Sequence, residues 1–259
     1  MRHNNTYTFV FITIVTIICA GLLSSAAYFL KDKQRINEEV DMKKNILKAV
    51  GLVGKEKLSQ NDVLDIYQKS IESFVVGHDG EMKDGKDDSE VEKIDPEKEE
   101  LKPENDRVYL VFTKTENNKI SAYCIPIIGK GLWSTMYGYL ALEPTLEKII
   151  GMTFYKQAET PGLGSEVESA SFQSKFIGKK IWDNVGNLVA ITILKGEPDS
   201  DSPNFNHEVA GISGATKTSE GVMNLLLKDL LKYENYFRRI RMEKIQTTVL
   251  GEEEITDVQ

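Results

Sequence analysis

The sequence is poor in the residues that build disulfide frameworks and zinc sites. It has two cysteines and three histidines in 259 residues. Cys19 lies in an apolar run and Cys124 in a strand-like stretch, so we expect no disulfide between them, and an isolated buried thiol is usually inert packing. These absences exclude a disulfide-stapled fold and argue against a zinc centre or a histidine-based metal site.

An excess of positive charge is also absent. The formal net charge is −8, and the lysines and arginines form no basic stripe. Nucleic-acid binding needs such a stripe, so we expect no nucleic-acid partner. No internal repeat is evident, and the length suits one mid-sized domain or two small ones. The hydrophobic share of 41% is enough for a core.

One long apolar run is present near the N-terminus. Residues 8–30 contain no charged side chain. As a helix, these residues would reach about 34 Å, enough to span the hydrocarbon core of a bilayer. We therefore expect a lipid-embedded helix at 8–30 after a short tail at 1–7. A cleaved signal peptide is the alternative, because the small residues at 24–27 resemble a cleavage site. The flanking charges slightly favour an outside N-terminus.

The rest of the chain divides by composition. Residues 31–76 have helical periodicity and are predicted to form a membrane-proximal helical segment. Residues 77–106 are rich in glycine, lysine and acidic residues and are predicted to be a solvated loop outside the core. Residues 107–246 are predicted to form the folded domain, and 247–259 a loose tail.

Strand and helix patterns both occur inside the predicted domain. Strands are expected at 107–114, 119–128, 146–157 and 188–196, the last being the clearest in the chain. Helices are expected at 169–182, with Phe172, Phe176 and Ile177 buried, and at 218–240, with Thr218 or Ser219 as N-cap. The fold class predicted is α+β: a mixed sheet with helices, preceded by one transmembrane helix.

An unusual concentration of small and hydroxyl residues precedes the last predicted helix. The stretch GISGATKTS occupies 211–219. Glycines allow close backbone approach, hydroxyls and Lys217 can bind phosphate oxygens, and helix N-termini attract anions. The stretch indicates a phosphate-holding turn or a hydroxyl joined to phosphate. A plain capped helix start stays equally open on these residues alone. The spacing fits neither a Walker A loop nor a nucleophile elbow.

Two further stretches are unusual. AETPGLGSEV at 158–167 places Leu163 between two glycines, which suits contact with a flat ring better than a surface turn. GKGLWSTMYG at 129–138 combines glycines with Trp133 and Ser134, which could form a ligand wall, although such aromatic residues are usually core.

Together, SGATKTS, ETPGLG and GKGLWSTMYGYLAL resemble the FMN-binding domains of the C subunit of the Na⁺-translocating NADH:quinone reductase and of the related G subunit of the Rnf complex. The resemblance covers about 107–237, and the GLWS segment is closer to the quinone reductase. It implies FMN joined to Thr216 through a phosphoester bond, attached by a separate flavin transferase. The other residues implied to bind the cofactor are Ser213, Gly214, Ala215, Glu159, Thr160, Leu163, Gly164, Trp133 and Ser134.

The resemblance also implies a role and a place. The domain would lie on the outer side of the cytoplasmic membrane and pass electrons within a complex that exports Na⁺. The chain departs from the family pattern at Ala210, where the pattern has Asp three places before the Ser. Two alternatives stay open: a reversible phosphate- or flavin-binding module, and an FMN-domain protein of another electron-transfer complex.

Overall fold

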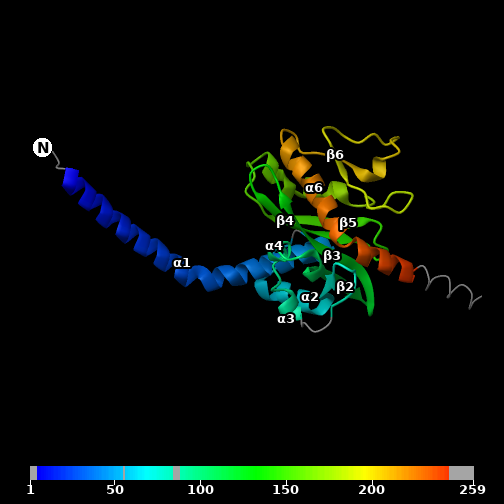
Figure 1. The fold of residues 1–259 in the computed structure, drawn as a ribbon, viewed down its shortest axis with the longest axis horizontal. Helices are drawn as coiled ribbons and strands as arrows, with labels where there is room; N and C mark the ends of the chain where they lie inside the picture. Colours follow the sequence, from blue (N-terminus) through cyan, green and yellow to red (C-terminus); the bar gives the residue numbers. More distant parts are fainter. Residues whose placement is uncertain (1–4, 55, 84–87, 245–259) are drawn as a thin grey trace, which may run out of the picture. The chain divides into compact units, whose positions relative to one another are not determined.

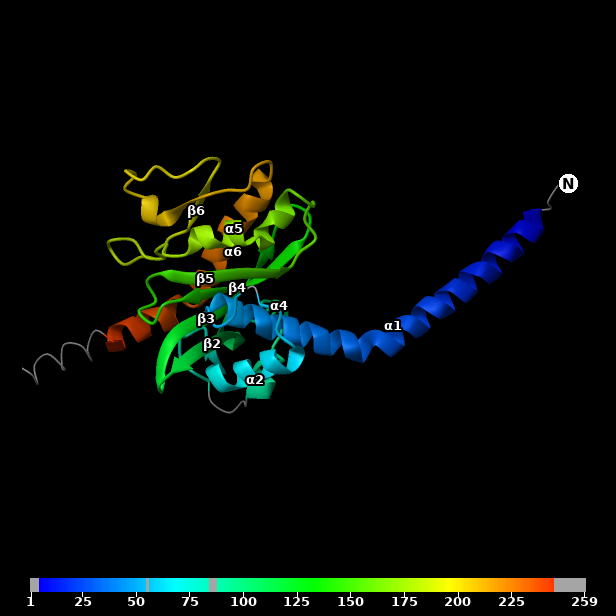
Figure 2. The same cartoon turned by 180° about the vertical axis from the view of Figure 1, so that it is seen from behind.

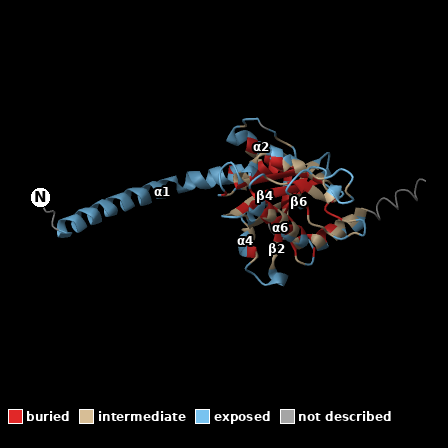
Figure 3. Cartoon of the chain, turned by 90° about the horizontal axis from the view of Figure 1, so that it is seen from above, coloured by how far each residue is buried: buried red, intermediate tan, exposed pale blue. Residues whose placement is uncertain are grey.

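The chain divides into two units, Met1–Met42 and Lys43–Gln259. The computed structural model describes residues 5–54, 56–83 and 88–244 (Figure 1). The first unit is helical from Asn5 onward, in helix α1 (Asn5–Ala49). By length and composition, α1 could span a membrane. Its apolar side chains over 8–30 are exposed, as Figure 3 shows in pale blue.

The second unit is built on an antiparallel sheet of five strands in the order β1-β2-β3-β4-β5. The strands are β1 (Ile71–Gly77), β2 (Val108–Glu116), β3 (Lys119–Lys130), β4 (Thr135–Leu142) and β5 (Ile149–Lys156). Asn117 and Asn118, with φ of 51° and 58°, form the tight turn between β2 and β3. Positive φ at both positions matches the twist of a two-residue hairpin.

Helices cover both faces of this sheet (Figures 1 and 2). One face packs against α6 (Thr216–Lys232) and α5 (Ala170–Gln173), whose apolar residues join those of the strands in one core. The other face receives the end of α1 and α2 (Gln60–Ser70). There, the Thr153 hydroxyl of β5 donates to the carbonyl of Asn45. Successive strand residues point to opposite faces, so strands that are covered on both sides are mainly apolar on both faces.

Shorter elements complete the second unit. They are α3 (Asp88–Val91), α4 (Pro96–Glu99), a parallel pair of strands β6 (Thr192–Leu194) and β7 (Glu208–Ala210), and 3₁₀ turns at Glu104–Asp106, Gly164–Glu168, Ser174–Phe176 and Phe205–His207. Residues 234–244 are again helical. The α+β class with a long apolar N-terminal helix is confirmed.

The predicted boundaries need correction at β1. The sequence pattern predicts helix for residues 71–76, yet Ile71–Gly77 pairs along its whole length with β2. The sheet therefore begins at Ile71 rather than near Arg107. The segment 77–106 is not all solvated loop either, because it contains α3 and α4 and buries Val91 and Glu99. The predicted tail at 247–259 lies outside the described residues.

Two predicted elements are much shorter than expected. The segment 188–196 contributes only Thr192–Leu194 to a sheet. The apolar side chains of this segment are explained by burial, as at Ile191, and they do not indicate a long strand paired in a sheet. The helix expected over 169–182 ends at Gln173, followed by a 3₁₀ turn, and Ile177 is 56% exposed instead of buried.

Candidate functional site

The three unusual stretches meet at one carboxylate. Glu159 follows β5 and is only 5% exposed. Its Oε1 accepts hydrogen bonds from the amides of Trp133 and Ser134, both at 2.9 Å, and from the Ser134 hydroxyl at 3.2 Å. Its Oε2 accepts from the amide of Leu132 at 3.1 Å and from the Thr218 hydroxyl at 2.7 Å. One side chain thus joins the β3–β4 turn to α6.

These donors decide the charge of Glu159. Burial alone would raise the pKa of this carboxyl, but the hydrogen bonds from Thr218 and from the turn amides outweigh burial and lower it. Donors that favour the ionised form have this effect. Glu159 is therefore a carboxylate whose oxygens are already occupied by protein donors. Its geometry suits it to hold the loops together, whereas the family resemblance implies that Glu159 binds the cofactor.

Ser134 is engaged in the same way. Its hydroxyl donates to Glu159 and accepts from the amide of Ala158 at 2.8 Å. Beside it, the side chain of Trp133 is 73% exposed, although its amide is fixed by Glu159. The turn therefore presents an exposed aromatic side chain on a backbone that is fixed by hydrogen bonds.

The loop after Glu159 is shaped by its own backbone. The amides of Leu163 and Ser165 both donate to the carbonyl of Thr160, at 3.1 and 3.2 Å. Leu163 has an unusual backbone conformation, with φ −127° and ψ −104°, and is 41% exposed. Gly164 is buried against Thr218 and Glu159. The turn thus holds an apolar side chain outward over the start of α6.

Helix α6 begins at Thr216, and its N-cap lies three or four residues before the predicted caps, Thr218 or Ser219. The N-cap residue, Ala215, makes no side-chain capping bond. Thr218 and Ser219, the expected caps, lie inside the first turn and are buried. Ser219 instead accepts from the amide of Ile212 through its hydroxyl at 3.3 Å. Without a side-chain cap, the helix start keeps its affinity for an anion.

The hydroxyls of the GISGATKTS stretch fall into two classes. Thr218 and Ser219 are buried with partners inside the protein, whereas Ser213 and Thr216 are exposed. Between the exposed pair, Gly214 has φ +74°, and a Cβ there would lie 2.9 Å from the Leu163 side chain. A side chain at 214 would be strained and would collide with Leu163. The exposed hydroxyls thus sit beside the exposed leucine.

Two predicted binding positions offer less than expected. Ala215 is buried, and its amide donates to the carbonyl of Ile212 at 3.1 Å, so that amide is used by the turn itself. Ala210, where the family pattern has Asp, ends β7 and is 4% exposed. Its carbonyl accepts from the Lys175 ammonium at 3.3 Å. In the part of the chain that the structure describes, no group of three or more potential metal ligands occurs.

The roles of Thr218 and of the Leu132 amide at Glu159 are not evident from the sequence. No local signal marks them, because each acts through a residue far away in the chain. Residues 131–231 match the FMN-binding domain family, a range that begins at the β3–β4 turn and ends in α6.

Relatives that align over most of the chain extend the match. The C subunit of the Na(+)-translocating NADH-quinone reductase of Haemophilus ducreyi is 36% identical over 84% of this chain and 86% of its own length. The chain belongs to this C-subunit family. The Neisseria meningitidis serogroup A member of the C-subunit family is also 36% identical, over 83% of this chain and 85% of its own.

Solved structures agree with the family. The crystal structure of the C subunit from Parabacteroides distasonis matches with a TM-score of 0.67 at 29% identity, covering 80% of this chain and 96% of that one. The name of the C-subunit family identifies its members as subunits of an oxidoreductase complex. This chain contains an FMN-binding domain. The resemblance found in the sequence is confirmed at the level of family and domain.

Proposed function

We propose that this chain is an electron-carrier subunit that holds FMN covalently on Thr216. The observation that carries the proposal is the sorting of hydroxyls around the start of α6. Thr218 and Ser219 are buried and bonded, which leaves Ser213 and Thr216 open to a modifying enzyme. Of these two, Thr216 is the first residue of an uncapped helix, where backbone amides and the helix dipole favour a phosphate.

The residues present fit a phosphate-linked flavin. The uncapped helix start would hold the phosphate, with Ser213 and Gly214 beside it. The exposed side chains of Leu163 and Trp133 would flank the ring, with Thr160 and Gly164 shaping the loop on which Leu163 lies. The flavin supplies the electron-transfer chemistry when bound, and the protein supplies position and electrostatics. Glu159 and Ser134 keep the two walls at a fixed separation through their bonds to the turn and to α6.

The partners follow from the family. A flavin transferase would attach the cofactor, and other subunits of a Na⁺-translocating NADH-quinone reductase would deliver and accept the electrons. Helix α1 would anchor the chain in the cytoplasmic membrane through 8–30, with the folded unit on the outer side. Protease added to spheroplasts would digest the folded unit in this topology, and full protection of that unit would contradict it.

The chain co-expressed with its flavin transferase tests the central proposal. Flavin fluorescence should persist in the band on a denaturing gel, and peptide mass should place the adduct on Thr216. The variant Thr216→Ala should give a dark band. The matched control is Thr218→Val, which keeps the Thr216 hydroxyl, so any adduct it forms should still map to Thr216. A dark band from the unmodified chain with active transferase would refute covalent attachment, whether because Ala210 replaces the Asp of the family pattern or because the domain binds flavin loosely or not at all.

The same experiment separates the alternatives. A reversible phosphate- or flavin-binding module would lose all flavin on denaturation. An FMN-domain protein of another electron-transfer complex would keep the adduct but would not co-purify with quinone reductase subunits. The comparisons favour the quinone reductase, since the relatives that match over most of both chains are named as its C subunit.

A further inference from the structure

The sheet opens at the end far from the hairpin turn of β2 and β3. Pairing between these strands runs only as far as Phe112 and Cys124. Beyond that point, Val108–Leu110 of β2 and both Pro126 and Ile128 of β3 border a small cavity instead of each other. Pro126 has no amide hydrogen to donate, which suits a place where the ladder ends.

Side chains from α6 replace the missing ladder bonds. Asp229 is 1% exposed, and its Oδ2 accepts from the amide of Ile128 at 2.5 Å. The hydroxyl of Tyr233 donates to the carbonyl of Leu110 at 2.8 Å. Buried backbone groups need hydrogen-bond partners. Asp229 supplies one to the amide of Ile128 in β3, and Tyr233 supplies one to the carbonyl of Leu110 in β2.

The acidic segment supplies the third replacement and closes the opening. We call residues 95–107 the strap; it contains α4 and the 3₁₀ turn at Glu104–Asp106. Glu99 of the strap is 7% exposed and accepts from the amide of Val108 at 3.2 Å. The strap therefore completes the sheet at a place where composition predicted only a solvated loop.

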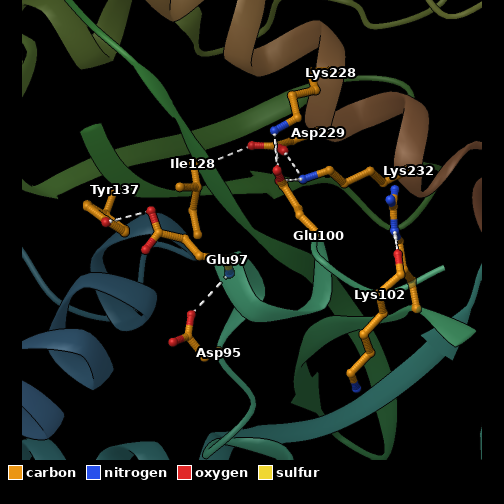
Figure 4. A network of polar contacts seen from close by, with 10 residues as sticks. Asp95, Glu97, Glu100, Lys102, Ile128, Tyr137, Lys228, Asp229 and Lys232 are labelled. Atoms are coloured by element: carbon orange, nitrogen blue, oxygen red, sulfur yellow. Dashed lines mark hydrogen bonds and ion pairs between the residues drawn. The ribbon is translucent and has the colours of Figure 1, made fainter. Parts of the chain in front are cut away.

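An ionic cluster ties the strap to α6 (Figure 4). Glu100 accepts from the ammonium groups of both Lys228 and Lys232, and Lys232 also bonds to Asp229 at 2.6 Å. Two carboxylates and two ammonium groups thus lie together across the strap and the helix. Burial raises the pKa of Glu100, but its two lysine partners outweigh burial and lower it, so Glu100 is ionised in the cluster.

The same helix carries the flavin site at its other end. Along one stripe of α6, Thr218 contacts Glu159, Gly221 lies against the carbonyl of Lys130, and Leu225 lies against Gly129. Asp229 continues this stripe to Ile128. A packed helix with contacts at each turn cannot shift at one end without disturbing the other, because protein interiors are close-packed.

We propose that the strap is a latch whose ionic cluster holds α6 seated on β3, so that releasing the strap loosens the loops around Thr216. The two states are a latched strap, with Glu100 on Lys228 and Lys232, and a released strap, with the opening between β2 and β3 uncovered. The strap and the site both contact α6, and each affects how α6 packs on β3. Coupling between distant positions requires such a shared element. The link to flavin holding rests on the function proposed above.

Hydrogen–deuterium exchange on the full-length chain in detergent, without flavin transferase, tests the latch. Glu100→Gln should speed exchange of the strap amides and, by about fivefold, of amides at 213–222 and 131–134. Amides in the β4–β5 ladder should be unchanged. Lys228→Gln, at a half-exposed position, is a milder variant for the case in which Glu100→Gln does not fold.

Glu104→Gln is the matched control, because Glu104 lies on the same strap but is 65% exposed and faces His78. It should leave exchange at 213–222 unchanged. Faster exchange in the strap with unchanged exchange at 213–222 would overturn the proposal. Failure of the wild-type chain to acquire flavin would refute the proposed function alone, since the exchange measurement is made without flavin.

Discussion

A buried carboxylate lies beside each end of α6, Glu159 from the loop after β5 and Asp229 from the helix itself, and the two differ in character. Glu159, near the helix start, receives hydrogen bonds from three backbone amides and two hydroxyls, and its pKa is lowered despite burial. Asp229, near the helix end, is more deeply buried, and burial raises its pKa although Lys232 and Ile128 oppose the shift. The balance between burial and the donors that stabilise the ionised form decides the sign.

The ends also differ in what they leave open. At the start of α6, Glu159 pulls three chain segments together and leaves Thr216, Leu163 and Trp133 exposed. At the far end, the strap covers the opening between β2 and β3 and pairs its own Glu100 with the lysines of α6. Glu159, whose oxygens accept from loop amides, fixes the loops around an open site. Glu100, which is paired with lysines, ties a surface segment to the helix. Substitutions at each end can break or sharpen this contrast.

The largest effect is expected from Glu159→Ala. Removing this carboxylate leaves the part-buried amides of Leu132, Trp133 and Ser134 and the buried hydroxyl of Thr218 without their acceptor. Unsatisfied buried donors cost about 1–3 kcal/mol each when water cannot replace the partner. We expect the free energy of unfolding to fall by about 3 kcal/mol, measured by urea denaturation of the flavin-free chain.

The control for this variant is Glu166→Ala, an exposed carboxylate on the same loop. It should change the unfolding free energy by less than about 0.5 kcal/mol. Equal losses in the two variants would show that the contrast between the helix ends does not depend on the bonds of Glu159.

Gly221→Ala should have the next largest effect, because it acts midway between the two ends. A Cβ at Gly221 would lie 2.4 Å from the carbonyl oxygen of Lys130, which belongs to a strand. Alanine gains about 1 kcal/mol of helix propensity over glycine, but the contact forces α6 away from β3. We expect a net loss of about 2 kcal/mol in urea denaturation, in the range typical of overpacking.

Asn224→Ala is the matched variant, since Asn224 lies on the exposed side of the same helix. It gains propensity without a clash and should be neutral or slightly stabilising. A stabilising Gly221→Ala would mean that α6 can move away from β3 without cost, and would weaken the latch proposal as well.

The opposite pKa shifts predict a pH effect for Asp229. Its folded-state pKa is raised from 3.8, so the folded chain binds the proton more readily than the unfolded chain. The free energy of unfolding should therefore fall as pH rises from about 4 through the raised pKa, by at most about 1.4 kcal/mol per pH unit. Asp229→Asn should lack this contribution.

The measurement compares the two chains by urea denaturation at a series of pH values from about 4 upward. Glu159 is present in both chains, so its contribution to stability, which is lost as pH falls below its unfolded pKa near 4.5, cancels in the comparison. Parallel pH profiles for wild type and Asp229→Asn would contradict the raised pKa of Asp229.

The smallest effect on stability is expected from Trp133→Ala. The side chain is 73% exposed, so its removal should change the unfolding free energy by less than about 0.5 kcal/mol. If Trp133 is a wall of the flavin site, the flavin absorbance band of the loaded chain should shift or lose its fine structure. An unchanged spectrum would remove Trp133 from the ring contacts and would leave Leu163 as the exposed wall.

Local patterns in the sequence predict much of the fold. Alternating residues in β2 and β3, the apolar run of α1 and the amphipathic stripe with Val222, Leu225 and Leu230 are all identified, because each is a property of neighbouring residues. The prediction of a long strand at 188–196 is wrong, since an apolar run reports burial without saying whether a strand partner is present.

The site is predicted in part for the same reason. The sequence locates GISGATKTS, ETPGLG and GLWS, and the comparisons confirm the family to which they point. The sequence does not predict that the oxygens of Glu159 accept hydrogen bonds from the β3–β4 turn and from α6, or that Thr218 is buried. These facts depend on contacts between residues more than twenty positions apart, which no local pattern encodes.

The sequence by itself determined the apolar N-terminal helix, the amphipathic α6 and the cluster of small residues and hydroxyls at its start. Only the tertiary structure decided which hydroxyls are exposed, which carboxylate is ionised by its donors and that an acidic segment completes the sheet. The physical reason is that residue type fixes the capacity to bond and to be buried, whereas partners and solvent exposure arise only when distant segments pack together.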